Sequence, residues 1–309
     1  MRCRITGTFK LLQIIICLAA LLLLQTSVAA QPLTISTKEI VVVYEVPLES
    51  AAAEVVRIYP KLKQELEEFF GWNLDTRPQV VLVNNTQSFR NLTHNDLFVA
   101  FAVPEKQLIV IDYSRMNIHP FTLSVTLKHE LCHLLLHHHI SRHNLPKWLD
   151  EGVCQWVSDG IGEIFVNQGW SGLDSAVMAG RIIPLVQLTD YFPRDGAALI
   201  LAYEQSKSLI NYVDRRYGDQ AILETLDLLK NGATVETALM DSLALSPRQL
   251  EKEWLSHLER TPRWLVFLAS HLYAIIFFLA ALLTMLGFMR HRRRRQRIYE
   301  KWEEEEDDE

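Results

Sequence analysis

Short apolar and β-branched runs mark the first third of the region that follows the N-terminal apolar segment. Runs of this kind, bounded by polar and turn residues, predict strands. We expect strands at 38–47, 79–83, 97–103 and 107–112. A turn at 104–106 joins the last two strands as an antiparallel pair, and a helical period covers 49–70.

Helical periods dominate the rest of this region. An apolar run at 121–140 predicts one helix, and Pro146, a residue favoured in the first turn, opens a second. Further helices are expected at 173–179, 196–217, 220–229, 235–241 and 247–258. The fold class is therefore α+β, with a small mixed β lobe followed by a helical lobe in one domain over 31–262.

Two apolar segments flank this domain. Residues 1–30 have a basic start, an apolar centre and small residues at the end, as in a cleaved signal peptide, with an uncleaved membrane anchor as the alternative. Residues 264–289 carry no formal charge and are long enough to cross a bilayer. Six Arg follow within the tail at 290–309, so the positive-inside rule predicts a cytoplasmic C-terminus. We expect a single-pass membrane protein whose domain is extracytoplasmic, in the periplasm or outside the cell.

Charge limits the partners of the domain. Residues 31–262 contain 20 Lys and Arg against 29 Asp and Glu, a net charge of −9, which argues against a nucleic-acid partner. The Arg cluster fits the anionic headgroups beside a membrane span. The acidic end at 303–309 indicates a solvated tail.

The predicted helix at 121–140 contains His129-Glu130-Leu131-Cys132-His133. Residues four apart on a helix lie about 40° apart around its axis, so the two His side chains can bind one metal ion. Glu130 beside them can act as general base toward a metal-activated water. The plainer alternative is a His-rich helix, because His137–His139 follow closely.

A catalytic zinc usually has three protein ligands, and two residues compete for the third place. His139 has the spacing of the third His in HExxHxxGxxH enzymes, but Leu136 occupies the Gly position where that chain turns. Glu151 instead lies on the helix opened by Pro146, which can fold back against the first helix.

The pair HELCH and WLDEG, with 17 residues between His133 and Glu151, resembles the gluzincin zinc metallopeptidases, and the chain resembles the peptidase MA-like domain family. The resemblance implies a zincin-like fold and one catalytic Zn²⁺ bound by His129, His133 and Glu151. It implies Glu130 as the base. Tyr203, near the start of its helix, is implied as the donor that stabilises the oxyanion; the alternative is a Tyr that packs in the core.

The sequence also departs from this family. Thermolysin-like enzymes have an Asp, four residues after the ligand Glu, that orients a His; Gln155 stands here. The stretch that binds a substrate's free amine in aminopeptidases is absent. Glu105 could serve instead, although it is more simply part of the turn at 104–106. Cleavage within a peptide and cleavage from its end both stay open.

Two smaller features remain. Cys132 and Cys154 lie three residues after His129 and Glu151, and they form either a disulfide or two buried thiols. The strand at 99–102 is a candidate edge for binding extended peptide, with core packing as the alternative.

The sequence predicts a membrane-anchored zinc metallopeptidase that acts on a peptide or protein substrate. Two other functions stay open. One is a catalytically inactive zincin-fold module that binds a partner at the membrane surface, although such a module has no need of Glu130. The other is zinc-dependent hydrolysis of a non-peptide amide.

Overall fold

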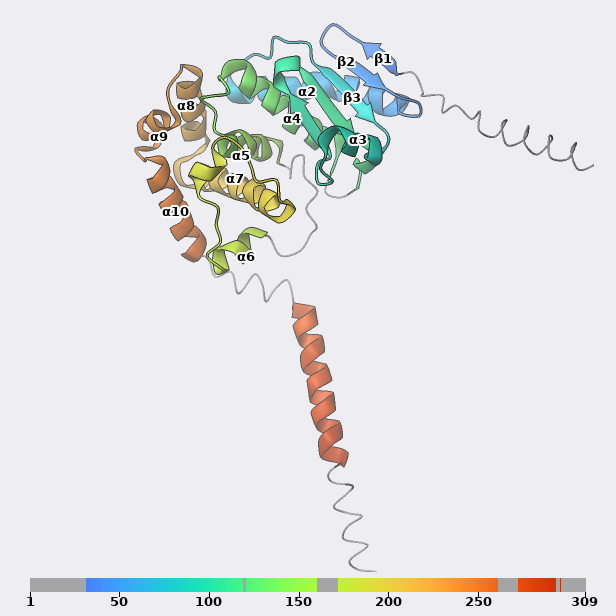
Figure 1. Ribbon diagram of the computed structural model, residues 1–309, viewed down its shortest axis with the longest axis vertical. Coiled ribbons are helices and arrows are strands. Elements are labelled where there is room, and N and C mark those ends of the chain that lie inside the picture. The colour runs from blue at the N-terminus through green and yellow to red at the C-terminus, as the bar shows by residue number, and fades with distance from the viewer. Residues whose placement is uncertain (1–31, 119–120, 160–171, 261–271, 293–294, 296–309) are drawn as a thin grey trace, which may run out of the picture. The chain divides into compact units, whose positions relative to one another are not determined.

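The computed structural model describes residues 32–118, 121–159, 172–260, 272–292 and 295 (Figure 1). The expected signal segment 1–30 and most of the tail 290–309 lie outside the described residues. Two compact units divide the chain. Unit 1 is Met1–His138 with Val157–Phe165, and unit 2 is His139–Trp156 with Val166–Glu309.

Unit 1 is built on a five-stranded mixed sheet of order β1-β2-β3-β5-β4. The central strands β2 (Val41–Tyr44), β3 (Gln79–Val83) and β5 (Leu108–Asp112) are parallel. The outer strands β1 (Leu33–Ser36) and β4 (Ala100–Val103) pair antiparallel with β2 and β5. The mixed β lobe is confirmed, whereas β1 was not predicted as a separate strand.

Helix α2 (Glu49–Phe70) provides the crossover between the parallel strands β2 and β3. Its buried residues, which include Val55, Tyr59, Leu62 and Leu66, repeat every three or four positions and form one face. That face packs against β1 and β2 (Figure 1). Both predicted ends of this helix are confirmed.

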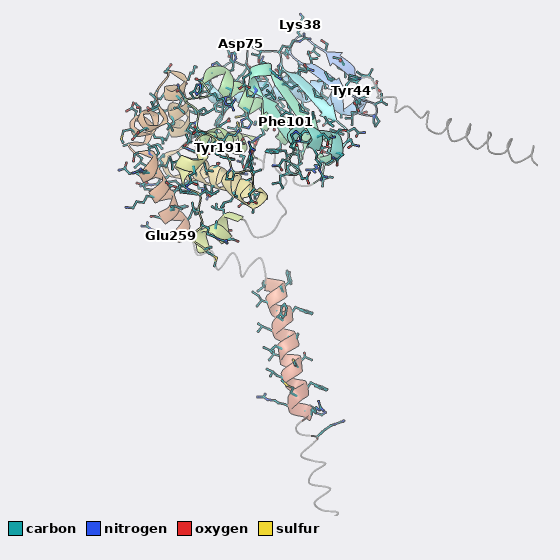
Figure 2. All side chains as sticks on the ribbon, viewed as in Figure 1. Lys38, Tyr44, Asp75, Phe101, Tyr191 and Glu259 are labelled. Atoms are coloured by element: carbon teal, nitrogen blue, oxygen red, sulfur yellow. The ribbon has the colours of Figure 1, made fainter. Side chains whose placement is uncertain are left out.

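Helix α3 (Thr86–Thr93) was not predicted, because eight residues carry too little periodicity. Its start is fixed by Asn85, whose side chain accepts hydrogen bonds from the backbone N–H groups of Gln87 and Ser88. The buried Phe89 packs its ring 5.7 Å from that of Phe101 on β4, which is labelled in Figure 2. The helix therefore covers β3 and β5.

Helix α4 (Leu123–His139) is buried on nearly every side, which explains why its sequence reads as a continuous apolar run rather than a stripe. Lys128 is one of its few partly exposed residues, and its ammonium contacts the Glu65 carboxylate of α2 at 2.8 Å. The hydrogen bond from Lys128 lowers the pKa of Glu65. The predicted helix at 121–140 is confirmed.

Unit 2 is helical. Its elements are α5 (Lys147–Ser158), α6 (Gly172–Met178), the short 3-10 helix η3 (Leu185–Leu188), α7 (Gly196–Tyr217), α8 (Asp219–Lys230), α9 (Val235–Leu243) and α10 (Pro247–Arg260). Helix α7 contacts α6, α8 and α10. The Asp195 side chain caps α7 by accepting from the backbone N–H of Ala198. Tyr203 therefore lies about two turns inside the helix, whose predicted extent of 196–217 is confirmed.

A separate helix, Leu272–Arg292, is long and apolar enough to cross a membrane, judged by length and composition. It overlaps the predicted span 264–289, of which 264–271 lies outside the described residues.

Candidate active site

His129 and His133 lie one turn apart on α4, and both are buried. Their Nε2 atoms are 3.2 Å apart and their ring planes are nearly perpendicular, at 83°. Two nitrogens that bind one tetrahedral zinc at the usual bond length lie about 3.3 Å apart. The pair is therefore spaced as two ligands of one ion.

Glu130 follows His129 directly on α4, and it is fully buried. An ionisable carboxylate is rarely buried to this degree unless it has a specific role or a specific partner. Its place beside the His pair agrees with the role of a base.

Glu151 lies on α5, which begins just after Pro146 as predicted. The side chain is fully buried, and its Oε1 contacts two other groups of unit 2. The Lys147 ammonium lies 2.6 Å from this oxygen, and the Tyr203 hydroxyl donates to it across 3.4 Å. Lys147 stands four residues before Glu151, a spacing at which helical ion pairs form, so this partner could have been read from the sequence.

The ligand atoms of His129, His133 and Glu151 lie within 4.8 Å of one another. Two imidazoles and one carboxylate form a donor set of the kind that catalytic zinc uses, so the residues fit the metal that the sequence implies. A second such group contains His133, His137 and Asp150. It shares His133 with the first, so the two groups would compete for that ligand.

His139 belongs to neither group. Helix α4 continues through Leu136 and ends at His139, so the sharp turn that would bring a third His back is not formed. Ten helical residues from His129 carry His139 about 15 Å along the axis. The unbroken helix therefore favours Glu151 over His139 as the third ligand beside His129.

Helices α5 and α7 approach each other closely at Gly152, the residue after Glu151. A Cβ atom added there would lie 2.6 Å from the backbone oxygen of Ser206 and 2.6 Å from Cγ1 of Ile210. Only glycine allows this approach. The Gly of the WLDEG motif thus brings the backbone of α5 onto α7, where Tyr203 stands one turn before Ser206.

We expect Gly152→Ala to lower the free energy of unfolding by about 1–3 kcal/mol, because the methyl group meets the Ser206 backbone, which cannot move aside, as well as the Ile210 side chain. Thermal unfolding of the purified chain measures this. Gly71→Ala is the control, since nothing lies within 4 Å of its added Cβ and only its φ of 67° opposes a side chain. A smaller loss at Gly152 than at Gly71 would contradict the close approach.

Three further contacts surround Tyr203 in unit 2. The edge of its ring meets Phe192 at a centroid distance of 5.0 Å, while the neighbouring Tyr191 is 75% exposed (Figure 2). The Gln155 side chain donates to the Tyr203 backbone carbonyl. The next residue, Glu204, accepts from the backbone N–H of Leu173 at the start of α6, and burial raises its pKa. None of these roles was predicted, because each depends on a long-range contact.

Cys132 and Cys154 are both fully buried, as either alternative expects. Glu105 lies in the 3-10 turn η1 (Pro104–Lys106) between β4 and β5, which confirms the turn. Strand β4 is an edge of the sheet, with Ala100 buried and the next three residues partly exposed.

The family model of the Peptidase MA superfamily matches residues 82–260. The chain belongs to this superfamily. The match includes α4, α5 and α7, which carry the residues described above. It confirms the predicted family, and a peptidase-type fold agrees with the mixed sheet and helical lobe.

Solved structures give a second comparison. Yeast LTA4 hydrolase in complex with bestatin is 14% identical to this chain, with a TM-score of 0.48. The match covers 75% of this chain and 38% of the hydrolase. A mutant two-domain M1 zinc metallopeptidase bound to L-arginine has a TM-score of 0.45 at 14% identity, with coverage of 73% and 51%. The M1 zinc metallopeptidase from Deinococcus radiodurans has a TM-score of 0.42 at 14% identity, and the match again covers 73% of this chain and 51% of that protein. This chain thus spans about half or less of their length. No curated protein matches it.

Proposed function

We propose that this member of the Peptidase MA superfamily is a zinc-dependent peptidase. The observation that carries the proposal is the donor set of His129, His133 and Glu151, with the buried carboxylate of Glu130 beside it. A bound zinc ion would supply Lewis-acid chemistry, polarising a carbonyl and acidifying water.

The chain's own residues then have separate tasks. His129, His133 and Glu151 hold the ion, and the Lys147 ammonium stabilises the Glu151 carboxylate in its ionised form. Glu130 takes the proton of the attacking water and returns it to the leaving amine. The Tyr203 hydroxyl, 3.4 Å from the Glu151 carboxylate, would turn its single proton from that carboxylate to the oxyanion that develops on the scissile carbonyl. The outer edge of β4 is the proposed place for extended substrate.

The experiment that tests the function uses the full chain in detergent with a diverse peptide library. Mass spectrometry reads the cleavage sites before and after treatment with a zinc chelator. Cleavage that the chelator abolishes and added zinc restores is the expected result. A full complement of zinc without cleavage of any peptide would instead favour a binding module or an enzyme for a different amide.

Tyr203→Phe tests the oxyanion role. The interaction exists mainly in the transition state, so we expect kcat to fall by about 10²-fold or more while KM changes little. Phe keeps the ring that packs against Phe192, so folding is preserved. A fall in kcat of less than about threefold would leave Tyr203 a core-packing residue.

We also propose that Leu272–Arg292 anchors the chain with the peptidase domain outside the cytoplasm, on the basis of its apolar length and the Arg cluster that follows. Protease added to intact cells or spheroplasts should digest the domain and spare an epitope attached at Glu309. A protected domain with a digested epitope would reverse this orientation.

A further inference from the structure

Gln155 is a buried polar residue on α5, one turn after Glu151, and only 2% of its surface is exposed. Its Nε2 donates to the backbone carbonyl of Glu151 at 3.2 Å and to that of Tyr203, also at 3.2 Å. One amide thus joins the backbone of the candidate ligand to that of the candidate oxyanion donor, within unit 2.

Both acceptors are helix carbonyls, and a carbonyl oxygen can accept a second hydrogen bond. An apolar side chain of the same size would bury itself at lower cost, because a buried amide needs partners for its polar atoms. Stabilisation of the fold alone therefore does not account for an amide at this buried position. The bond to Glu151 stays within α5, whereas the bond to Tyr203 crosses to α7 and helps to fix the position of α5 along it.

Gln155 is not the sole side chain of α5 that bonds to α7, since Trp156 Nε1 donates to the Asp214 carboxylate at 3.3 Å. Gly152 lets the helices touch, yet a glycine presents a smooth surface with no side chain to lock the contact. The Tyr203 hydroxyl reaches the Glu151 carboxylate only at 3.4 Å, so a small slide of α5 along α7 breaks the contact. A displacement of about 1 Å at a catalytic group can lower the rate about 10²-fold.

We propose that Gln155 is a positioning residue that acts through Tyr203 and Glu151: its amide clamps α5 to α7 and holds the Tyr203 hydroxyl beside the Glu151 carboxylate. The role in catalysis rests on the proposed function, but the clamp itself does not.

The test compares Gln155→Met with Gln205→Met in the full chain. Met keeps the length and volume of Gln and loses the amide. Gln205 is the matched control, because it is also fully buried and its amide bonds to the backbone N–H and carbonyl of Ile183. We expect Gln155→Met to lower kcat about 10-fold with KM nearly unchanged, and Gln205→Met to stay within about threefold of wild type.

A double-mutant cycle with Tyr203→Phe separates positioning from general stability. If Gln155 acts through Tyr203, the double variant should lose no more than about threefold beyond Tyr203→Phe alone. Multiplied losses, an unchanged kcat in Gln155→Met, or a reduced kcat in that variant while Tyr203→Phe stays fully active would each overturn the proposal.

Zinc affinity, measured by competition with a chromogenic chelator, gives a readout that needs no activity. We expect Gln155→Met to weaken zinc binding about 10-fold, the low end for losing an outer partner of a ligand, while Gln205→Met leaves it unchanged. If the wild-type chain binds zinc but cleaves no peptide, the proposed function fails while this difference still tests the clamp. Equal affinities in the two variants would overturn it.

Discussion

Replacing Glu130 with Gln should remove nearly all hydrolysis and leave about one zinc per chain. The amide has the shape of the carboxylate and cannot take a proton from the attacking water. A positioned general base typically contributes about 10²- to 10⁴-fold, so kcat/KM should fall within that range. The three candidate ligands are unchanged. Peptide cleavage rates and the zinc content of the purified protein measure the two effects together.

Glu65→Gln is the control for this change. It alters the same functional group on α2, where Glu65 contacts Lys128 of α4, and it touches no candidate ligand. Its activity should equal that of the wild type. Near-normal hydrolysis by Glu130→Gln would remove Glu130 from the mechanism. Loss of zinc together with activity would instead mean that Glu130 maintains the metal site.

Local patterns predicted the helices well. The ends of α2 and α7 follow from apolar periodicity and from the turn residues beside them, and α5 begins directly after Pro146. Helix α3 escaped notice because its start depends on one side-chain cap, that of Asn85. The parallel order of β2, β3 and β5 could not be read from the sequence, since pairing between distant strands leaves no local trace.

The residues of the candidate site also differ in whether local sequence patterns could predict them. His129, Glu130 and His133 share one helix, so their common location follows from spacing alone. Glu151 required a second helix and a resemblance to a family. The contacts of Gly152 and Gln155 with α7 could not be predicted, because their partners, Ser206 and Tyr203, lie about fifty residues away in the sequence. Residues that bind through local geometry are visible in sequence, and residues that align two helices are not.

The final prediction decides between the two kinds of zinc site. Loss of a residue that only supports a ligand weakens metal binding by roughly 10–100-fold. Glu151→Ala removes a direct ligand, so it should weaken zinc binding by more than this. In the wild type the Lys147 ammonium lies 2.6 Å from the Glu151 carboxylate. The substitution removes this carboxylate and leaves the positive charge of Lys147 near the zinc ion.

His139→Ala should leave zinc affinity within about twofold of wild type, because helix α4 carries this residue about 15 Å along its axis from His129. Equilibrium dialysis with chelator competition measures both variants under identical conditions. Loss of the metal in His139→Ala alone would replace the gluzincin assignment with a three-histidine site. That site would need α4 to unwind before Leu136, where the chain is fully buried and helical. The unbroken helix is therefore the physical reason to expect Glu151, and not His139, as the third ligand.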